Sequence, residues 1–147
     1  MAIEINQIEE TETRRESKLK EMPLFMGLSK KDLEDVTKHT HYNRKHYKKG
    51  ATIISEGKSC TSLIVVTSGW VRAITQNDKN AYRMEEIMQA NIILEPEKLF
   101  GIKTTYHSSY IAHTTCEVLE VTKEEVMRLI EQYLIVRLNL LNIICRK

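Results

Sequence analysis

The stretch ATIISEGKSCTSLIVVTSGWVRAITQND, residues 51–78, consists of short β-type runs that alternate with turn residues. Glycine separates the runs, because a chain reversal needs backbone angles that glycine adopts at little cost. Gly57 and Gly69 lie within this stretch, and Gly50 immediately precedes it. Asn77 and Asp78 mark a further hairpin turn. Several short strands at such close spacing favour a sandwich or barrel of the jelly-roll kind.

Helical signals come before the β-type region, which extends over about residues 42–121. Ser29 can cap a helix, Asp32 adds a negative charge to its first turn, and Leu33 begins an apolar face. Residues 3–20 carry acids first and bases later, an order that suits the dipole of a helix. Because apolar residues are scarce there, we expect a poorly anchored helical arm.

A second helical region follows the strands. Thr122 and Glu125 have the spacing of a capping box. The last segment, YLIVRLNLLNIICRK (133–147), is apolar almost all round, and part of it has the alternating steps of four and three of a coiled-coil seam. The seam residues are Leu134, Leu138, Leu141 and Cys145. One small domain cannot bury both this seam and the broader apolar face beside it, so we predict a homodimer.

The composition fits one intracellular domain. A chain of 147 residues needs neither disulfides nor a structural metal, because it can bury about 68–70% of its unfolded surface. The three cysteines are widely spaced and form no C-x-x-C pair, which argues against a disulfide framework or a zinc ribbon. The sequence has neither a signal peptide nor 18 consecutive apolar residues. We therefore expect a cytoplasmic protein with no membrane partner.

The charge balance gives no sign of direct nucleic-acid binding. Lysine and arginine number 22 and aspartate and glutamate 20, so the net charge of +2 excludes a polycation that binds nucleic acid by bulk charge. The basic run KHTHYNRKHYKKG, residues 38–50, lacks the motifs of nucleic-acid recognition modules. We interpret it as a solvated segment ahead of the barrel.

Three segments match a known family in order and at the right separations. They are LFMGLSKKDLEDV (24–36), YKKGATIISEGKSCTSLIVVTSGWVRA (47–73) and HTTCEVLEVTKEEVMRLI (113–130). The chain resembles the N-terminal effector domain of the Crp/Fnr transcription regulators, which is a cyclic-nucleotide-binding-like domain. The resemblance implies a mainly β fold with flanking α-helices: a jelly-roll or β-roll, the double-stranded β-helix of this family, with N-terminal helices and a C-terminal dimerisation helix.

The resemblance also implies a division of the chain. Residues 1–21 would form the N-terminal helical arm, residues 22–132 the β-roll domain, and residues 133–147 the start of the dimerisation helix. In the family a winged helix-turn-helix that reads DNA follows this helix, and no segment is left for it here. Because the last helical pattern also lacks a stop signal, we expect the sensory and dimerising half of a regulator that contacts DNA only through a further C-terminal domain.

The ligand site implied by the resemblance lies in ILEPEKLFGIKTTYHSSYIAHTT, residues 93–115. Family members that bind cyclic nucleotides hold the phosphate with a helix N-terminus and an arginine-serine pair, and the ribose hydroxyl with a glutamate that follows a glycine. Glu95 matches the glutamate, but Leu94 takes the place of the glycine. Tyr106 takes the place of the arginine and His107 that of the serine. The cassette is therefore degenerate.

Loss of the arginine weakens phosphate binding, because arginine answers a desolvated phosphate with two parallel hydrogen bonds. Removing one partner of such a pair costs roughly 3–5 kcal/mol, which is roughly 100- to 3000-fold in affinity. We expect no cyclic nucleotide binding of the usual kind. Three alternatives remain for these residues. They bind a small polar effector, they fill the pocket themselves, or they form a hairpin at the surface with no ligand. The candidate effector-binding residues are Glu95, Tyr106, His107, Ser108 and Ser109.

Other constellations favour neither catalysis nor metal binding. His39 and His41 alternate as ligands on a strand would, but a cupin-type metalloenzyme also needs a nearby glutamate, and none follows before Glu56. His113 and Cys116 are three residues apart on a predicted strand, so they face opposite sides and form no base and nucleophile pair. We expect no enzyme activity, no metal and no cofactor.

Three functions therefore stay open from sequence alone. The favoured one is the sensory and dimerisation domain of a Crp/Fnr-type transcription regulator, which transmits pocket occupancy to the paired helices. The second is a functional sensor of cyclic AMP or cyclic GMP. The third is a stand-alone structural dimerisation module with no effector.

Overall fold

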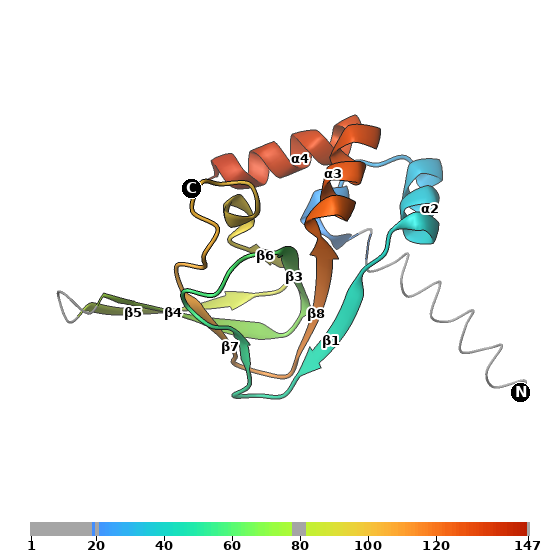
Figure 1. Ribbon diagram of the computed structural model, residues 1–147. Coiled ribbons are helices and arrows are strands. Elements are labelled where there is room, and N and C mark those ends of the chain that lie inside the picture. The colour runs from blue at the N-terminus through green and yellow to red at the C-terminus, as the bar shows by residue number, and fades with distance from the viewer. Residues whose placement is uncertain (1–18, 20, 78–81, 147) are drawn as a thin grey trace, which may run out of the picture. The chain divides into compact units, whose positions relative to one another are not determined.

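Figure 1 shows the computed structural model of the chain, which describes residues 19, 21–77 and 82–146. The chain forms two compact units. Residues 42–127 form one, here called the roll unit, and the described residues up to His41 together with those from Arg128 onward form the other, the helical unit. The arm expected at residues 3–20, apart from Leu19, and the turn residue Asp78 lie outside the described residues.

The roll unit contains two four-stranded antiparallel sheets. In order across the first sheet, the strands are β1 (Asn43–Tyr47), β8 (Cys116–Thr122), β3 (Ser62–Ser68) and β6 (Ile92–Leu94). In order across the second, they are β2 (Thr52–Ile54), β7 (Ser109–Ala112), β4 (Trp70–Asn77) and β5 (Tyr82–Gln89). The mainly β, jelly-roll fold predicted from the sequence is confirmed.

The centre of the first sheet is the pairing of β3 with β8. Val65 lies opposite Leu119 and Leu63 opposite Val121, and all four side chains are buried. β3 is apolar without interruption over residues 63–66, the pattern of a strand that is covered on both faces, whereas Glu117 and Glu120 interrupt the apolar residues of β8. The strand signals at SLIVVTSG and CEVLEV therefore predicted the most buried part of the roll.

The helices begin where their capping signals predicted. In the helical unit, α2 (Lys30–His39) starts after Ser29, whose Oγ accepts a hydrogen bond from the N–H of Asp32 at 3.1 Å. At the start of α3 (Lys123–Gln132), Thr122 Oγ1 accepts one from the N–H of Glu125 at 3.3 Å. The short helix η1 (Pro23–Phe25) precedes α2, and α4 (Leu134–Cys145) ends the described chain.

The basic run differs from its interpretation as a segment ahead of the barrel. Part of it forms β1, an edge strand whose backbone pairs with β8. Its side chains are largely exposed and contact carboxylates of β8: Lys45 Nζ forms an ion pair with Glu120 at 3.2 Å, and His46 Nε2 lies 3.2 Å from Glu117. Polar side chains suit an edge strand, because only its backbone pairing is needed for the sheet.

Gly69 makes the turn between β3 and β4 and tolerates no side chain. Its φ is +94°, in the left-handed region that favours glycine. A Cβ atom there would lie 2.3 Å from the carbonyl oxygen of Thr115 and 2.9 Å from Cys116 Sγ. The neighbouring Trp70 N–H donates to Thr114 Oγ1 at 2.9 Å, so this turn and the segment before β8 are held together.

We predict that Gly69→Ala lowers the free energy of unfolding by about 2–5 kcal/mol, because left-handed strain and overpacking add. Gly57→Ala is the matched control: its φ is +84°, but no atom lies within 4 Å of the added Cβ. That variant should lose only the backbone cost of about 1–2 kcal/mol. Urea unfolding of both variants measures the difference, and equal losses would contradict the packing argument.

Candidate functional site

The candidate site begins where β6 ends. Glu95 follows the last residue of that strand and precedes the short helix η2 (Pro96–Leu99). Its φ is 44°, in the left-handed region. A residue with a side chain adopts this conformation at a cost of roughly 1–2 kcal/mol, and it persists only where the surroundings hold it. Contacts of the Glu95 side chain should therefore offset the strain.

Three hydrogen bonds hold the buried carboxylate of Glu95. Oε1 accepts the N–H of His107 at 2.9 Å, and Oε2 accepts the N–H of Ser108 at 3.2 Å and the hydroxyl of Tyr110 at 2.7 Å. Hydrogen bonds to a charged group contribute about 1.5–3 kcal/mol each, more than the bend costs. The carboxylate thus joins the end of β6 to the start of β7.

Strand alternation brings Tyr110 to this carboxylate. Ser108, Tyr110 and Ala112 are buried, while Ser109 between them is half-buried, as expected when successive side chains point to opposite faces. Burial raises the pKa of the Tyr110 hydroxyl, and its hydrogen bond and proximity to the negative Glu95 raise that pKa further. The hydroxyl is therefore protonated at neutral pH and donates to the carboxylate.

Tyr106 is buried beside a small cavity of the roll unit. Its hydroxyl donates to the carbonyl of Ser62 at 3.4 Å, and its backbone exchanges hydrogen bonds with Gly57 and Lys58, both at 2.9 Å. Burial, followed by a hydrogen bond to the Cys60 thiol, raises the pKa of Tyr106. The cavity has a volume of about 210 Å³, and Ser62 and Lys58 also line it.

The remaining candidate residues have different surroundings. The Ser108 hydroxyl is hydrogen-bonded to the hydroxyl of Thr75 on β4. Ser109 Oγ accepts the N–H of Glu56 at 2.9 Å, in the turn after β2. The His107 side chain is exposed, and the residue reaches the carboxylate only through its backbone N–H. The structure thus joins His107 and Ser108 to the Glu95 carboxylate through their backbone N–H groups, whereas the side chains of Tyr106, Ser108 and Ser109 have other partners.

No guanidinium group takes part in this cluster within the described residues. The arginines of the roll unit are Arg44, Arg72 and Arg83. Arg44 Nε lies 3.8 Å from Glu117 Oε1, and Arg83 Nη2 lies 2.7 Å from Glu85 Oε1, so both guanidinium groups pair with glutamates outside the cluster. The third, Arg72, is adjacent on β4 to Ala73, the cross-strand partner of Tyr110. Because neighbouring residues of a strand face opposite sides, it lies on the other face of the sheet from this tyrosine.

Sequence reasoning missed Tyr110 and Thr75. A signal for Tyr110 was present, because it stands two positions after Ser108 and therefore shares its face on a strand. The contact of Thr75 with Ser108 spans 33 positions, and no local pattern predicts such a pairing. Within the described residues, no three His, Cys, Asp or Glu side chains gather as a metal site would require.

A family model described as the cyclic nucleotide-binding domain matches residues 44–133. The chain belongs to the cyclic nucleotide-binding domain family. The resemblance found in the sequence is thereby confirmed. No curated protein matches the chain.

Solved structures share the fold of this cyclic nucleotide-binding domain at low sequence identity. The Thermus thermophilus catabolite activator protein is 22% identical with a TM-score of 0.72, and the match covers 84% of this chain and 57% of that one. The sensor domain of the transcriptional regulator DNR from Pseudomonas aeruginosa is 16% identical with a TM-score of 0.73, covering 90% and 87%.

A third neighbour is the N-terminal domain of a transcriptional regulator from Streptomyces coelicolor A3(2), which is 19% identical with a TM-score of 0.66. The match covers 88% of this chain and 90% of that one. The chain spans just over half of the Thermus protein but most of the Pseudomonas sensor domain and of the Streptomyces N-terminal domain.

None of the helices described here has the length and apolar character needed to cross a membrane.

We predict that Tyr110→Phe lowers the free energy of unfolding by about 1.5–3 kcal/mol, because it removes a donor to a buried charge. Tyr106→Phe is the control, since it deletes the same atom from an equally buried ring but removes contacts to neutral groups only, the Ser62 carbonyl at 3.4 Å and the Cys60 thiol. That variant should lose about 1 kcal/mol or less. Denaturant unfolding compares the two, and a larger loss for Tyr106→Phe would contradict this ranking.

Proposed function

We propose that the chain is the sensory and dimerising domain of a Crp/Fnr-type transcription regulator whose effector is not a cyclic nucleotide bound in the usual way. Family membership and the regulatory domains among its solved neighbours support the regulatory part. In the intact regulator the chain acts without catalysis, and DNA is contacted through a further domain beyond α4. Pocket occupancy controls that domain by biasing two arrangements of the paired helices.

The observation that carries the proposal is that the hydrogen-bonding capacity of the Glu95 carboxylate is already used within the chain. The resemblance assigns a ribose hydroxyl to this group, yet three donors of the chain itself already bind it. A ribose hydroxyl would have to displace one of them or share the oxygen, so it gains little net hydrogen bonding. The guanidinium that would hold the phosphate is also missing from the cluster, so both polar ends of a cyclic nucleotide are poorly matched.

A small effector of neutral or weakly polar character suits the site better. The cavity of about 210 Å³ beside Tyr106 is also lined by the hydroxyl-bearing residues Thr61 and Ser62 and by the apolar residues Ile54 and Ile64. Hydroxyls both donate and accept hydrogen bonds, which matches an uncharged polar ligand rather than a phosphate. No metal or cofactor is part of this proposal.

We predict that cyclic AMP and cyclic GMP leave the melting temperature unchanged. A ligand at about a hundred times its dissociation constant adds about 2.7 kcal/mol to stability, which calorimetry of the purified chain would detect readily. A dose-dependent rise that is lost in Glu95→Gln would contradict the proposal and favour the alternative of a cyclic nucleotide sensor.

The dimer surface in the proposal is the outer side of α4. Asn139 Nδ2 donates to the carbonyls of Leu24 and Met26 at 2.9 and 2.8 Å, which fixes the rotation of α4 against η1. Val136 and Leu140, one turn apart, are buried on this inner side. The predicted seam stays outside: Leu134 is 60%, Leu138 47% and Leu141 53% exposed, and Cys145 is also exposed.

A row of exposed leucines on one helix is the surface a coiled-coil partner buries. The occupant proposed for it is a second copy of the same helix, because a self-complementary leucine seam suits a two-fold pair. The inner side is already held by η1, so dimerisation through the seam requires no rearrangement of α4 within the helical unit.

We predict that Leu138→Lys converts the dimer to monomer, since a charge in an apolar seam is costly to bury. Ile102→Lys is the matched control, because this isoleucine is fully exposed in the roll unit and lies on no proposed interface. Sedimentation equilibrium should show dimer for the wild type and the control and monomer for Leu138→Lys. A monomeric wild type would overturn the dimer surface.

A further inference from the structure

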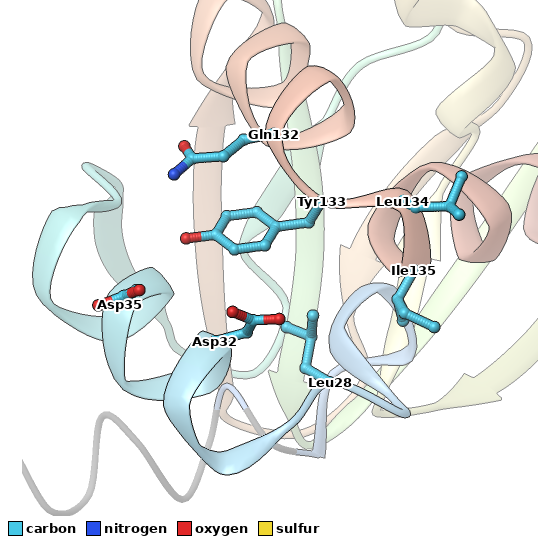
Figure 2. A pocket seen from close by; sticks show the side chains of 7 residues that line it. All are labelled: Leu28, Asp32, Asp35, Gln132, Tyr133, Leu134 and Ile135. Carbon is cyan, nitrogen blue, oxygen red and sulfur yellow. The ribbon is translucent and has the colours of Figure 1, made fainter.

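The helical unit contains a pocket of about 350 Å³ between α2 and the junction of α3 with α4. Figure 2 shows this pocket with the side chains that line it. Three of them are apolar: Leu28 before α2, and Leu134 with Ile135 at the start of α4. The volume lies at the lower end of the range of about 300–1,000 Å³ that small-molecule sites have.

The polar wall of the pocket carries two negative charges. Asp32 and Asp35 are three residues apart on α2, so their side chains project from the same face of the helix. Within the described residues, neither carboxylate forms an ion pair or a side-chain hydrogen bond. Both are half-buried, a position in which a bound cation is screened less than at an open surface.

A buried tyrosine points into the same space. Tyr133 separates α3 from α4 in an extended conformation and is only 8% exposed. Its hydroxyl has no hydrogen-bond partner among the described residues and is accessible from the pocket that Tyr133 lines. Figure 2 shows its ring between Gln132 and the two aspartates, with the hydroxyl directed toward α2.

The surroundings of Tyr133 raise the pKa of its hydroxyl. Burial raises the pKa of Tyr133, the carboxylates of Asp35 and Asp32 raise it further, and Arg128 opposes them. The Arg128 guanidinium is held by the side-chain oxygen of Gln132 at 3.0 Å and by the carbonyl of His39 at 3.2 Å. The pocket therefore offers two carboxylates and a neutral hydroxyl oxygen, all able to accept hydrogen bonds.

We propose that this pocket binds an organic cation, an alkyl ammonium or alkyl guanidinium group. Its N–H donors match the carboxylates of Asp32 and Asp35 and the hydroxyl oxygen of Tyr133. Its alkyl part contacts Leu28, Leu134 and Ile135. An anion is repelled by the two aspartates, and two carboxylates with one hydroxyl fall short of the six to eight oxygen ligands that calcium takes.

The same chemistry has two sources, a basic side chain in a peptide and a free diamine. Two probes distinguish them: N-acetylarginine N-methylamide, which represents an arginine side chain, and putrescine, a free diamine. The corresponding citrulline derivative is the control, because it has nearly the same shape as the arginine probe but carries no charge. The experiment is a titration of the full chain followed by ¹H–¹⁵N NMR, with the Gln132 side-chain amide as reporter inside the pocket.

The expected result is saturable shifts of the Gln132 amide with at least one cationic probe, and none with the citrulline derivative. The tighter of the two cations identifies the source. Asp35→Asn should weaken binding about tenfold and Tyr133→Phe about threefold, the effects of one charged and one neutral hydrogen bond. Glu34→Gln is the matched control, because it removes one negative charge from the same helix without lining the pocket.

Three outcomes would overturn the proposal. The first is the absence of saturation with both cations. The second is equal binding of the citrulline derivative, which would mean that charge is not recognised. The third is an equal loss of affinity in Glu34→Gln and Asp35→Asn, because the binding would then reflect the general charge of α2. The wild-type titrations with the charged and uncharged probes decide the matter even if a variant fails to fold.

Discussion

The carboxylate of Glu95 connects the two sheets of the roll unit at the candidate site. Glu95 follows β6, the edge strand of one sheet, and its backbone makes a left-handed bend there. Its carboxylate accepts hydrogen bonds from Tyr110 of β7, in the other sheet, and from the residues just before that strand. Two of these donors are backbone N–H groups, which would otherwise need other partners when buried. A single side chain thus satisfies the backbone of the connection, offsets the strain of the bend and fixes where Tyr110 lies.

This arrangement also limits what the site can do. A buried carboxylate that already accepts three hydrogen bonds is stable without a ligand, so a ligand must offer more than one hydroxyl to compete for it. In a site left open for a ribose, the same carboxylate would have unsatisfied lone pairs and would gain a partner on binding. Whether the Glu95 carboxylate can bind a ligand therefore depends mainly on the hydrogen-bond donors around it, which come from Tyr110 and from the loop before β7.

Much of the fold could be predicted because its signals are local. The apolar runs of β3 and β8, the Ser29 cap and the turn at Gly69 each rest on a few adjacent residues, and the structure confirms them. β1 could not be predicted in the same way, because an edge strand of charged residues is held by backbone pairing that leaves no apolar pattern. The position of Glu95 came from the family resemblance, whereas its partners depend on loop geometry over 12 to 15 positions.

The two sides of α4 show how one polar residue resolves an ambiguous pattern. A helix that is apolar all round gives no preferred direction for its hydrophobic side, so the sequence alone could not decide which leucines face the protein. Asn139 marks the rotation that the structure adopts, because it donates two hydrogen bonds to the segment around η1 while Val136 and Leu140 are buried. Leu134 then lies both on the outward seam and at the rim of the aspartate pocket. Under the two proposals, the second copy of α4 and the organic cation both contact Leu134, so any change that one makes in the affinity of the other is matched by the same factor in return.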